Sequence, residues 1–111
     1  MIDANVELER LKSMHPPARL LSERGHPVVL LPTFSFRAAG QDQIMDLLLV
    51  PWAHSGGYPT RLFFERAIRE RGQNWTEQYA VDRKWWTPSW NGVPATRSWR
   101  DILGAHIRGI A

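Results

Sequence analysis

Residues 43–64 constrain the fold of this chain more than any other stretch. Two runs of branched and aromatic apolar residues flank a loop that holds two prolines and two glycines. Apolar runs of this length that are bounded by turn-forming residues predict β-strands. Residues 47–50 are apolar without interruption, which indicates a strand that is covered on both faces. We therefore expect this strand to form the centre of the core.

The length of 111 residues predicts one compact domain that spans residues 1–111. No segment approaches the ~18 uninterrupted apolar residues of a membrane helix, and the first residues have neither a basic start nor an apolar run. We therefore expect a cytoplasmic protein without a membrane partner. The sequence contains no cysteine, and its four histidines are scattered, so we expect no disulfide, no thiol nucleophile, no metal site and no cofactor.

The net charge of +3 and the pI near 10 come from basic residues that are spread along the chain. We interpret them mainly as a solvated surface. An alternative class is single-stranded nucleic-acid binding, in which bases would stack on aromatic side chains between basic ones. The residues concerned are Arg83, Lys84, Trp85, Trp86 and Arg97. The chain lacks Lys-rich or Gly-rich arms, and its aromatic residues are needed for packing, so we do not favour a nucleic-acid partner.

A short amphipathic helix is predicted near the start of the chain, over residues 6–14. Apolar residues recur at a spacing of three from Leu8 to Met14, with charged residues between them. Asn5 is the predicted N-cap. The helix is expected to end at His15, because two prolines follow and a residue before proline avoids the helical conformation.

An antiparallel meander of three or four strands is predicted next. Residues 19–22 and 28–36 form its first two strands, and the two runs of the central stretch form the others. Pro32 lies inside the second strand, where it cannot donate a ladder hydrogen bond, so it marks a bulge or an edge position. The connections are short, which favours antiparallel neighbours.

The segment of residues 73–94 shows no clean period but carries five large aromatic residues. We predict that it is a long ordered loop held in place by these aromatic side chains. The residues before it, 65–72, are consistent with either one helical turn or a loop.

The last segment gives the clearest helix prediction, over residues 99–110. Its apolar residues follow the spacing of one helical face, and Ser98 with Asp101 forms a capping signature. His106 lies on the apolar face, which favours a core histidine over a catalytic one. The predicted order is therefore a helix, a meander, a long loop and a helix that packs on the sheet, which is an α+β domain.

That order resembles the ubiquitin-conjugating enzyme fold. Three local features carry the resemblance: an apolar strand with a Tyr-Pro turn and a following strand, a Trp and a Pro at the entry to the last helix, and a helix that precedes a Pro-Pro pair. In this sequence they are residues 47–51, Gly57, Tyr58, Pro59, residues 62–64, Trp90, Pro94, Ala95, Thr96, Pro16 and Pro17.

The chain also departs from the pattern of this family. The family's His-Pro-Asn signature and its catalytic cysteine are both missing, and the segment where the cysteine belongs, residues 79–90, offers Asp82, Thr87 and Ser89 instead. The chain is shorter than typical members, and its Trp-rich segment is more similar to compact bacterial relatives. The resemblance implies a ubiquitin-conjugating-enzyme-like protein of a bacterial modification system. Its partners would be a ubiquitin-like protein and an adenylating activating enzyme.

Three hypotheses follow from the missing thiol. The protein is a non-catalytic binding variant, or a hydroxyl carries the ubiquitin-like protein as an oxyester, or an original cysteine has been replaced in this sequence. Under the second hypothesis Ser89 is the first candidate and Thr87 the second. A hydroxyl nucleophile needs a base, and His54 is the candidate if the Tyr-Pro loop folds toward the Trp-rich segment. The simpler interpretations are a turn role for His54 and a loop-stabilising role for Ser89.

Large aromatic side chains left partly exposed would anchor a protein partner, because Trp dominates binding hot spots. The candidates for partner binding are Trp85, Trp86, Trp90 and Tyr58.

Overall fold

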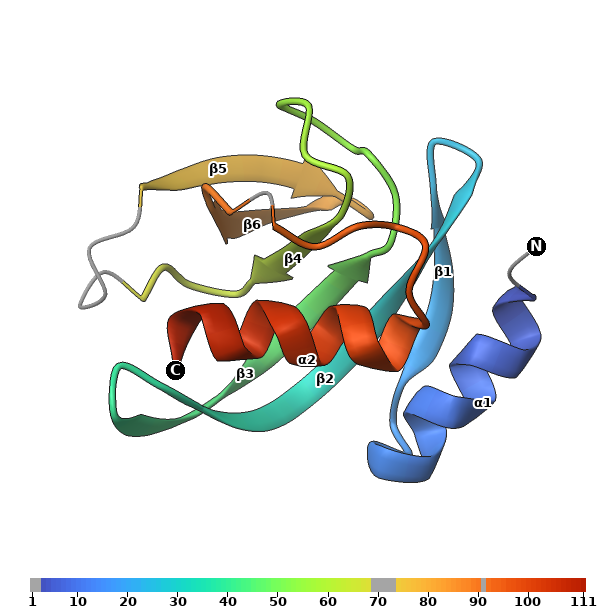
Figure 1. The fold of residues 1–111 in the computed structure, drawn as a ribbon, viewed down its shortest axis with the longest axis horizontal. Helices are drawn as coiled ribbons and strands as arrows, with labels where there is room; N and C mark the ends of the chain where they lie inside the picture. The colour runs from blue at the N-terminus through green and yellow to red at the C-terminus, as the bar shows by residue number, and fades with distance from the viewer. Residues whose placement is uncertain (1–2, 69–73, 91) are drawn as a thin grey trace.

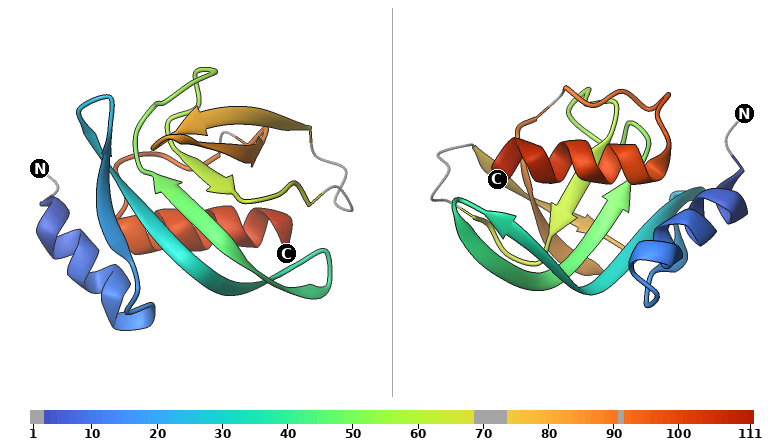
Figure 2. Two further views of the ribbon diagram at one scale, coloured as in Figure 1. Left: turned by 180° about the vertical axis from the view of Figure 1, so that it is seen from behind. Right: turned by 60° about the horizontal axis from the view of Figure 1, so that its bottom comes forward.

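The computed structural model describes residues 3–68, 74–90 and 92–111. In this part of the chain two helices flank one six-stranded antiparallel sheet (Figure 1), with the strand order β1-β2-β3-β4-β6-β5. The elements are α1 (Ala4–Met14), β1 (Arg19–Glu23), β2 (His26–Ala38), β3 (Gln41–Val50), β4 (Arg61–Phe64), β5 (Trp75–Ala80), β6 (Arg83–Pro88) and α2 (Trp99–Ile110). The helix α2 lies across one face of the sheet, and α1 lies beside β1 (Figure 2). The predicted α+β class is confirmed.

The strand β3 forms the centre of the core, as the apolar run predicts. It pairs with β2 on one side and β4 on the other, and residues 47–50 are fully buried. Leu47 and Leu49 contribute to the cluster beneath α2, whereas Leu48 and Val50 contribute to a second cluster on the opposite face. Continuous apolarity therefore reflects burial on both faces.

The predicted loop over residues 73–94 is wrong, because most of this segment forms the hairpin β5–β6. Strand β6 pairs with β4 through Phe64 and Trp86, and it thereby extends the four-stranded meander to six strands. The turn of this hairpin, Val81-Asp82, has positive φ at both residues, as a two-residue type I′ turn requires. The residue types do not predict this turn, because neither is the glycine or asparagine that usually marks it.

The other two hairpins use the same device with a more readable sequence. Arg24-Gly25 joins β1 to β2, and Ala39-Gly40 joins β2 to β3. All four residues have positive φ, and the glycine in each pair adopts that conformation without steric cost. These short turns fix the antiparallel register of the first three strands.

A bulge interrupts β2 at Pro32, as predicted. The register with β3 shifts between Leu31 and Phe34, and Thr33 has a φ of 49°. The Thr33 backbone N–H donates to the Asp46 carboxylate at 2.8 Å. A side chain of the neighbouring strand thus satisfies the donor that the bulge removes from the ladder.

Side chains cap the N-termini of both helices. The N-cap of α1 is Asp3, which accepts from the backbone of Asn5 and Val6; the predicted cap at Asn5 is wrong by two residues. Helix α1 ends at His15, as the following prolines predict. Ser98 caps α2 by accepting from the Asp101 backbone N–H at 3.2 Å, which confirms the capping signature.

No sequence pattern predicts the contact that joins the two helices. The buried Glu7 of α1 accepts a hydrogen bond from the backbone N–H of Trp99, the first residue of α2, at 2.8 Å. A carboxylate at this position also complements the positive end of the helix dipole. Glu7 therefore fixes the start of α2 against α1.

The sheet curls enough to bring its two ends together. Leu21 of β1 and Val81 of the β5–β6 turn both pack against the second cluster. The Val81 backbone N–H donates to Glu23 at 3.0 Å, although β1 and the β5–β6 hairpin stand at opposite ends of the strand order. The last hairpin is thereby tied to the first.

Candidate functional site

The segment that follows β6 carries the first predicted nucleophile. Ser89 is exposed, and its backbone N–H donates to the Asn74 carbonyl at 2.8 Å. Within the described residues no side chain forms a hydrogen bond with its hydroxyl. The hydroxyl therefore has no bonded base in this part of the chain, and a base is what a hydroxyl requires in order to attack an acyl group.

Thr87, the second candidate, occupies a different environment. It is 1% exposed, and its hydroxyl donates to the Leu62 carbonyl at 3.0 Å. This bond links β6 to β4. The hydroxyl thus has a structural partner and no access to solvent in this conformation.

The histidine proposed as the base lies in the core rather than beside these hydroxyls. His54 is 5% exposed, and its ring lies between the rings of Trp52 and Phe63. Its Nε2 is 3.8 Å from the Glu23 carboxylate. Burial lowers its pKa, and the positive charges of Arg24 and Arg61 lower it further, against the opposing effect of Glu23. None of its contacts in the described part of the chain is with Ser89 or Thr87.

The predicted aromatic anchors divide by exposure. Trp85 is fully buried in the second cluster, with its indole N–H donating to the Ala80 carbonyl at 3.1 Å. Trp86 is partly buried against the cluster beneath α2. Trp90 is 40% exposed, and a side chain at Gly109 would place its Cβ 3.3 Å from the Trp90 ring. Trp90 therefore covers the end of α2 and keeps one part of its ring in solvent.

The fourth predicted anchor, Tyr58, is partly buried in the loop before β4. The guanidinium of Arg61 lies 4.1 Å from the centre of its ring, which is cation–π geometry. Trp85 presents no face to a base or to a partner's side chain because it is fully buried, and Arg61 covers one face of the Tyr58 ring.

The second buried histidine has a complete structural explanation. His106 of α2 lies 4% exposed, with Nε2 at 2.9 Å from the Thr60 hydroxyl. That hydroxyl also lies 2.9 Å from the Val93 carbonyl. Because the carbonyl can only accept, Thr60 donates to it and accepts from the Nε2–H of a neutral His106. Burial, assisted by the charge of Arg61, lowers the pKa of His106 to about 4.

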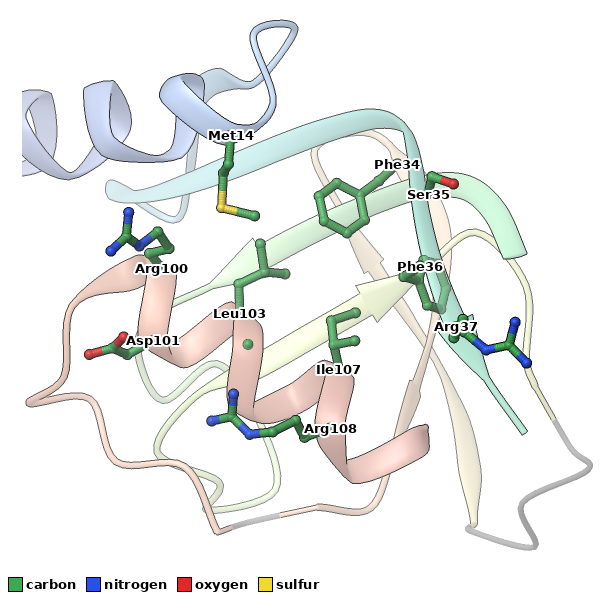
Figure 3. Close-up of a pocket in the computed structure, with 11 residues that line it drawn as sticks. Met14, Phe34, Ser35, Phe36, Arg37, Arg100, Asp101, Leu103, Ile107 and Arg108 are labelled. Atoms are coloured by element: carbon green, nitrogen blue, oxygen red, sulfur yellow. The ribbon is translucent and has the colours of Figure 1, made fainter. Parts of the chain in front are cut away.

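A groove lies between α2, β2 and the end of α1, on the helix side of the molecule. Figure 3 shows Leu103 and Ile107 of α2 pointing toward Phe34 and Phe36 of β2. Met14, which is 48% exposed, closes one end. The groove has a volume of about 550 Å³. An apolar hollow with a few convergent polar groups is the usual form of a binding site.

The rim of this groove is mainly basic. Arg37, Arg100 and Arg108 line it, together with the single acid Asp101. Arg37 is already paired with Asp42 at 2.9 Å. Arg100 and Arg108 are exposed and form no ion pair in the described part of the chain. The groove thus combines an apolar floor with two available cations.

Comparisons with known proteins identify no relative: no protein-family model matches the chain, and neither the curated proteins nor the solved structures yield a match. No helix among the described residues is long and apolar enough to cross a membrane. The same residues contain no group of three His, Cys, Asp or Glu side chains arranged to hold a metal ion.

Sequence patterns did not reveal the groove, for a geometric reason. Its floor joins alternate residues of a strand to residues of a helix more than sixty positions later. The one available signal is Ile107, an apolar residue at the margin of the α2 stripe that remains partly exposed. Such a residue is common on helices and does not by itself indicate a site.

Proposed function

We propose that this protein binds and positions a ubiquitin-like protein, as a non-catalytic relative of ubiquitin-conjugating enzymes. The order of the elements supports the family assignment: α1, an antiparallel meander with a Tyr-Pro turn before β4, and α2 across the sheet. The β5–β6 hairpin, which replaces the expected active-site loop, is the main departure. The partner and the adenylating activating enzyme that would supply it follow from the resemblance.

The observation that carries the binding hypothesis is the groove between α2 and β2. Its apolar floor would accept aliphatic or aromatic side chains of a partner, and Arg100 and Arg108 on its rim would pair with the partner's carboxylates. Such pairs guide association and orientation more than they add affinity. The buried contact with Leu103 and Ile107 is expected to supply most of the binding free energy.

The surroundings of the two hydroxyls favour positioning over covalent carriage. Thr87 is buried and bonded to Leu62. Ser89 is exposed but has no base among its described contacts. A carrier needs its nucleophile and base within hydrogen-bond reach, and neither residue meets that condition here.

The test is a reaction of this protein with an adenylating activating enzyme, a ubiquitin-like protein from the same genome and ATP, followed by native and intact mass spectrometry. We expect a non-covalent complex without a mass adduct. A mass adduct that is absent in Ser89→Ala would contradict non-covalent positioning. It would show instead that Ser89 carries the ubiquitin-like protein as an oxyester. If no complex forms, the family assignment itself is wrong.

The groove is tested by two matched variants in the same assay. Ile107→Gln removes an apolar group from the groove floor, and we expect affinity to fall by about tenfold, the equivalent of ~1.4 kcal/mol. Ile44→Gln changes an equally apolar residue of β3 that is 60% exposed outside the groove, and it should bind normally. Equal losses in both variants would show that the partner does not use the groove.

A further inference from the structure

Most of the unpartnered buried polar atoms among the described residues belong to one short segment, residues 54–61. In the described part of the chain, six buried side-chain nitrogen or oxygen atoms lack a hydrogen-bond partner. Five of them belong to three residues, His54, Ser55 and Arg61. An unsatisfied buried polar group destabilises the folded state by about 1–3 kcal/mol. Several such groups in one segment therefore indicate that they bind a ligand.

Arg61 is the strongest element of this cluster. It is 5% exposed, and no acceptor for its Nε or Nη1 lies in the described part of the chain. No carboxylate in the described residues forms an ion pair with it. Its guanidinium lies over the face of the Tyr58 ring, 4.1 Å from the ring centre. A buried guanidinium without a counter-charge is costly, and a bound anion would remove that cost.

Glu23, the carboxylate beside His54, is engaged with groups other than Arg61. Glu23 accepts from the Val81 backbone at 3.0 Å and lies 3.6 Å from Arg24. It also faces His54 at 3.8 Å. The three charges that act on His54 are therefore Arg24, Glu23 and Arg61, and their sum is positive. The site as a whole favours an anion.

The unpartnered atoms also specify the chemistry of the ligand. The guanidinium supplies two N–H donors and no acceptor, the Ser55 hydroxyl supplies one O–H donor, and the ring of His54 supplies at least one N–H. A ligand that accepts from all three must present several oxygen acceptors close together. A carboxylate, phosphate or sulfate has that property.

Gly56 places an exposed stretch of backbone beside this cluster. This residue is exposed and has a φ of +67°. A Cβ there would lie 3.0 Å from Nη2 of Arg61 and 2.8 Å from the Tyr58 ring. The absence of a side chain therefore leaves the guanidinium next to an exposed stretch of backbone. The adjacent Gly57 is also exposed, with open space at its Cβ position.

We propose that His54, Ser55 and Arg61 form a binding site for a small oxyanion, which enters beside Gly56. The oxyanion is either a free inorganic ion or the terminal carboxylate of a peptide. The inference stands apart from the groove and from the proposed partner, because none of its residues lines the groove.

Nuclear magnetic resonance of the wild-type protein gives the direct test. The Nε–H signal of Arg61 is followed during titration with sodium phosphate, at an ionic strength held constant with sodium chloride. Parallel titrations use acetyl-diglycine and its amide. Saturable shifts with phosphate alone identify an inorganic ion, and shifts with the free acid but not the amide identify a terminal carboxylate. If no titrant shifts the signal, the proposal is wrong and these atoms bind internal water.

Two variants separate the site from general charge effects. Arg61→Gln should lower the affinity for the titrant that binds the wild type by about tenfold or more, because a charge-assisted hydrogen bond is lost. Arg19→Gln removes an exposed arginine that lines neither this site nor the groove, and this variant should bind the same titrant with unchanged affinity. If Arg61→Gln does not fold, Ser55→Ala should lower the affinity several-fold. Equal binding by wild type and the variant that folds would overturn the proposal.

Discussion

Acidification should destabilise this protein through His106. In the folded state this histidine is neutral and donates through Nε2 to the Thr60 hydroxyl, which in turn donates a hydrogen bond to the Val93 carbonyl. Protonation would place a second positive charge near Arg61 in a buried site. The folded protein therefore resists binding a proton that the unfolded chain accepts readily.

The direction and size of the effect follow from the two pKa values. The pKa of His106 is about 4 in the folded protein, against 6.5 for an ordinary histidine. Between these values the unfolded state binds more protons, so stability is fully present above pH 6.5 and falls as the pH is lowered toward 4. From pH 7.5 to pH 4.5 this residue alone should lower the free energy of unfolding by about 2.5 kcal/mol.

Urea unfolding at pH 7.5 and pH 4.5 measures this loss. The wild type is compared with His106→Gln, which cannot gain a charge but keeps a donor for Thr60, and with His26→Gln, which changes an exposed histidine. Each protein is compared with itself at the two pH values, so contributions from other titrating groups are common to all. We expect His106→Gln to lose less stability than the wild type by about 2.5 kcal/mol, and His26→Gln to lose as much as the wild type. An identical loss in all three proteins would refute the buried neutral state of His106.

Three further predictions concern contacts that hold the fold. Thr87→Val should lower the free energy of unfolding by about 1–2 kcal/mol, because the Leu62 carbonyl is left without its donor; a near-neutral result in chemical denaturation would contradict the buried bond. Glu7→Ala should lower the free energy of unfolding by about 1–3 kcal/mol, because the Trp99 N–H is left unpaired. Glu9→Ala changes an exposed residue of the same helix and should alter this free energy little. Gly56→Ala should lower the melting temperature more than Gly57→Ala, since both glycines have positive φ but only the first would place a Cβ 2.8 Å from the Tyr58 ring; equal shifts would exclude that contact.

The sequence by itself determined the elements whose signals are local. Periodicity predicted α2, proline predicted the end of α1 and the bulge in β2, and continuous apolarity predicted the buried strand β3. Each of these signals acts through a residue's own backbone or its immediate neighbours. Local interactions therefore suffice to place such elements. The predicted cap of α1 is wrong by two residues because Asp3 and Asn5 lie close together and both are residue types that favour the N-cap position.

Only the tertiary structure decided the features that join distant residues. The β5–β6 hairpin escaped prediction because its turn, Val81-Asp82, adopts positive φ without glycine; the pairing with β4 and the bond to Glu23 compensate for that strain. The same holds for the candidate sites. The groove joins β2 to α2, and only the fold shows that Arg61 is buried without an ion pair among the described residues. Sequence specifies which groups are present, whereas the free energy of a buried charge depends on what the fold brings beside it.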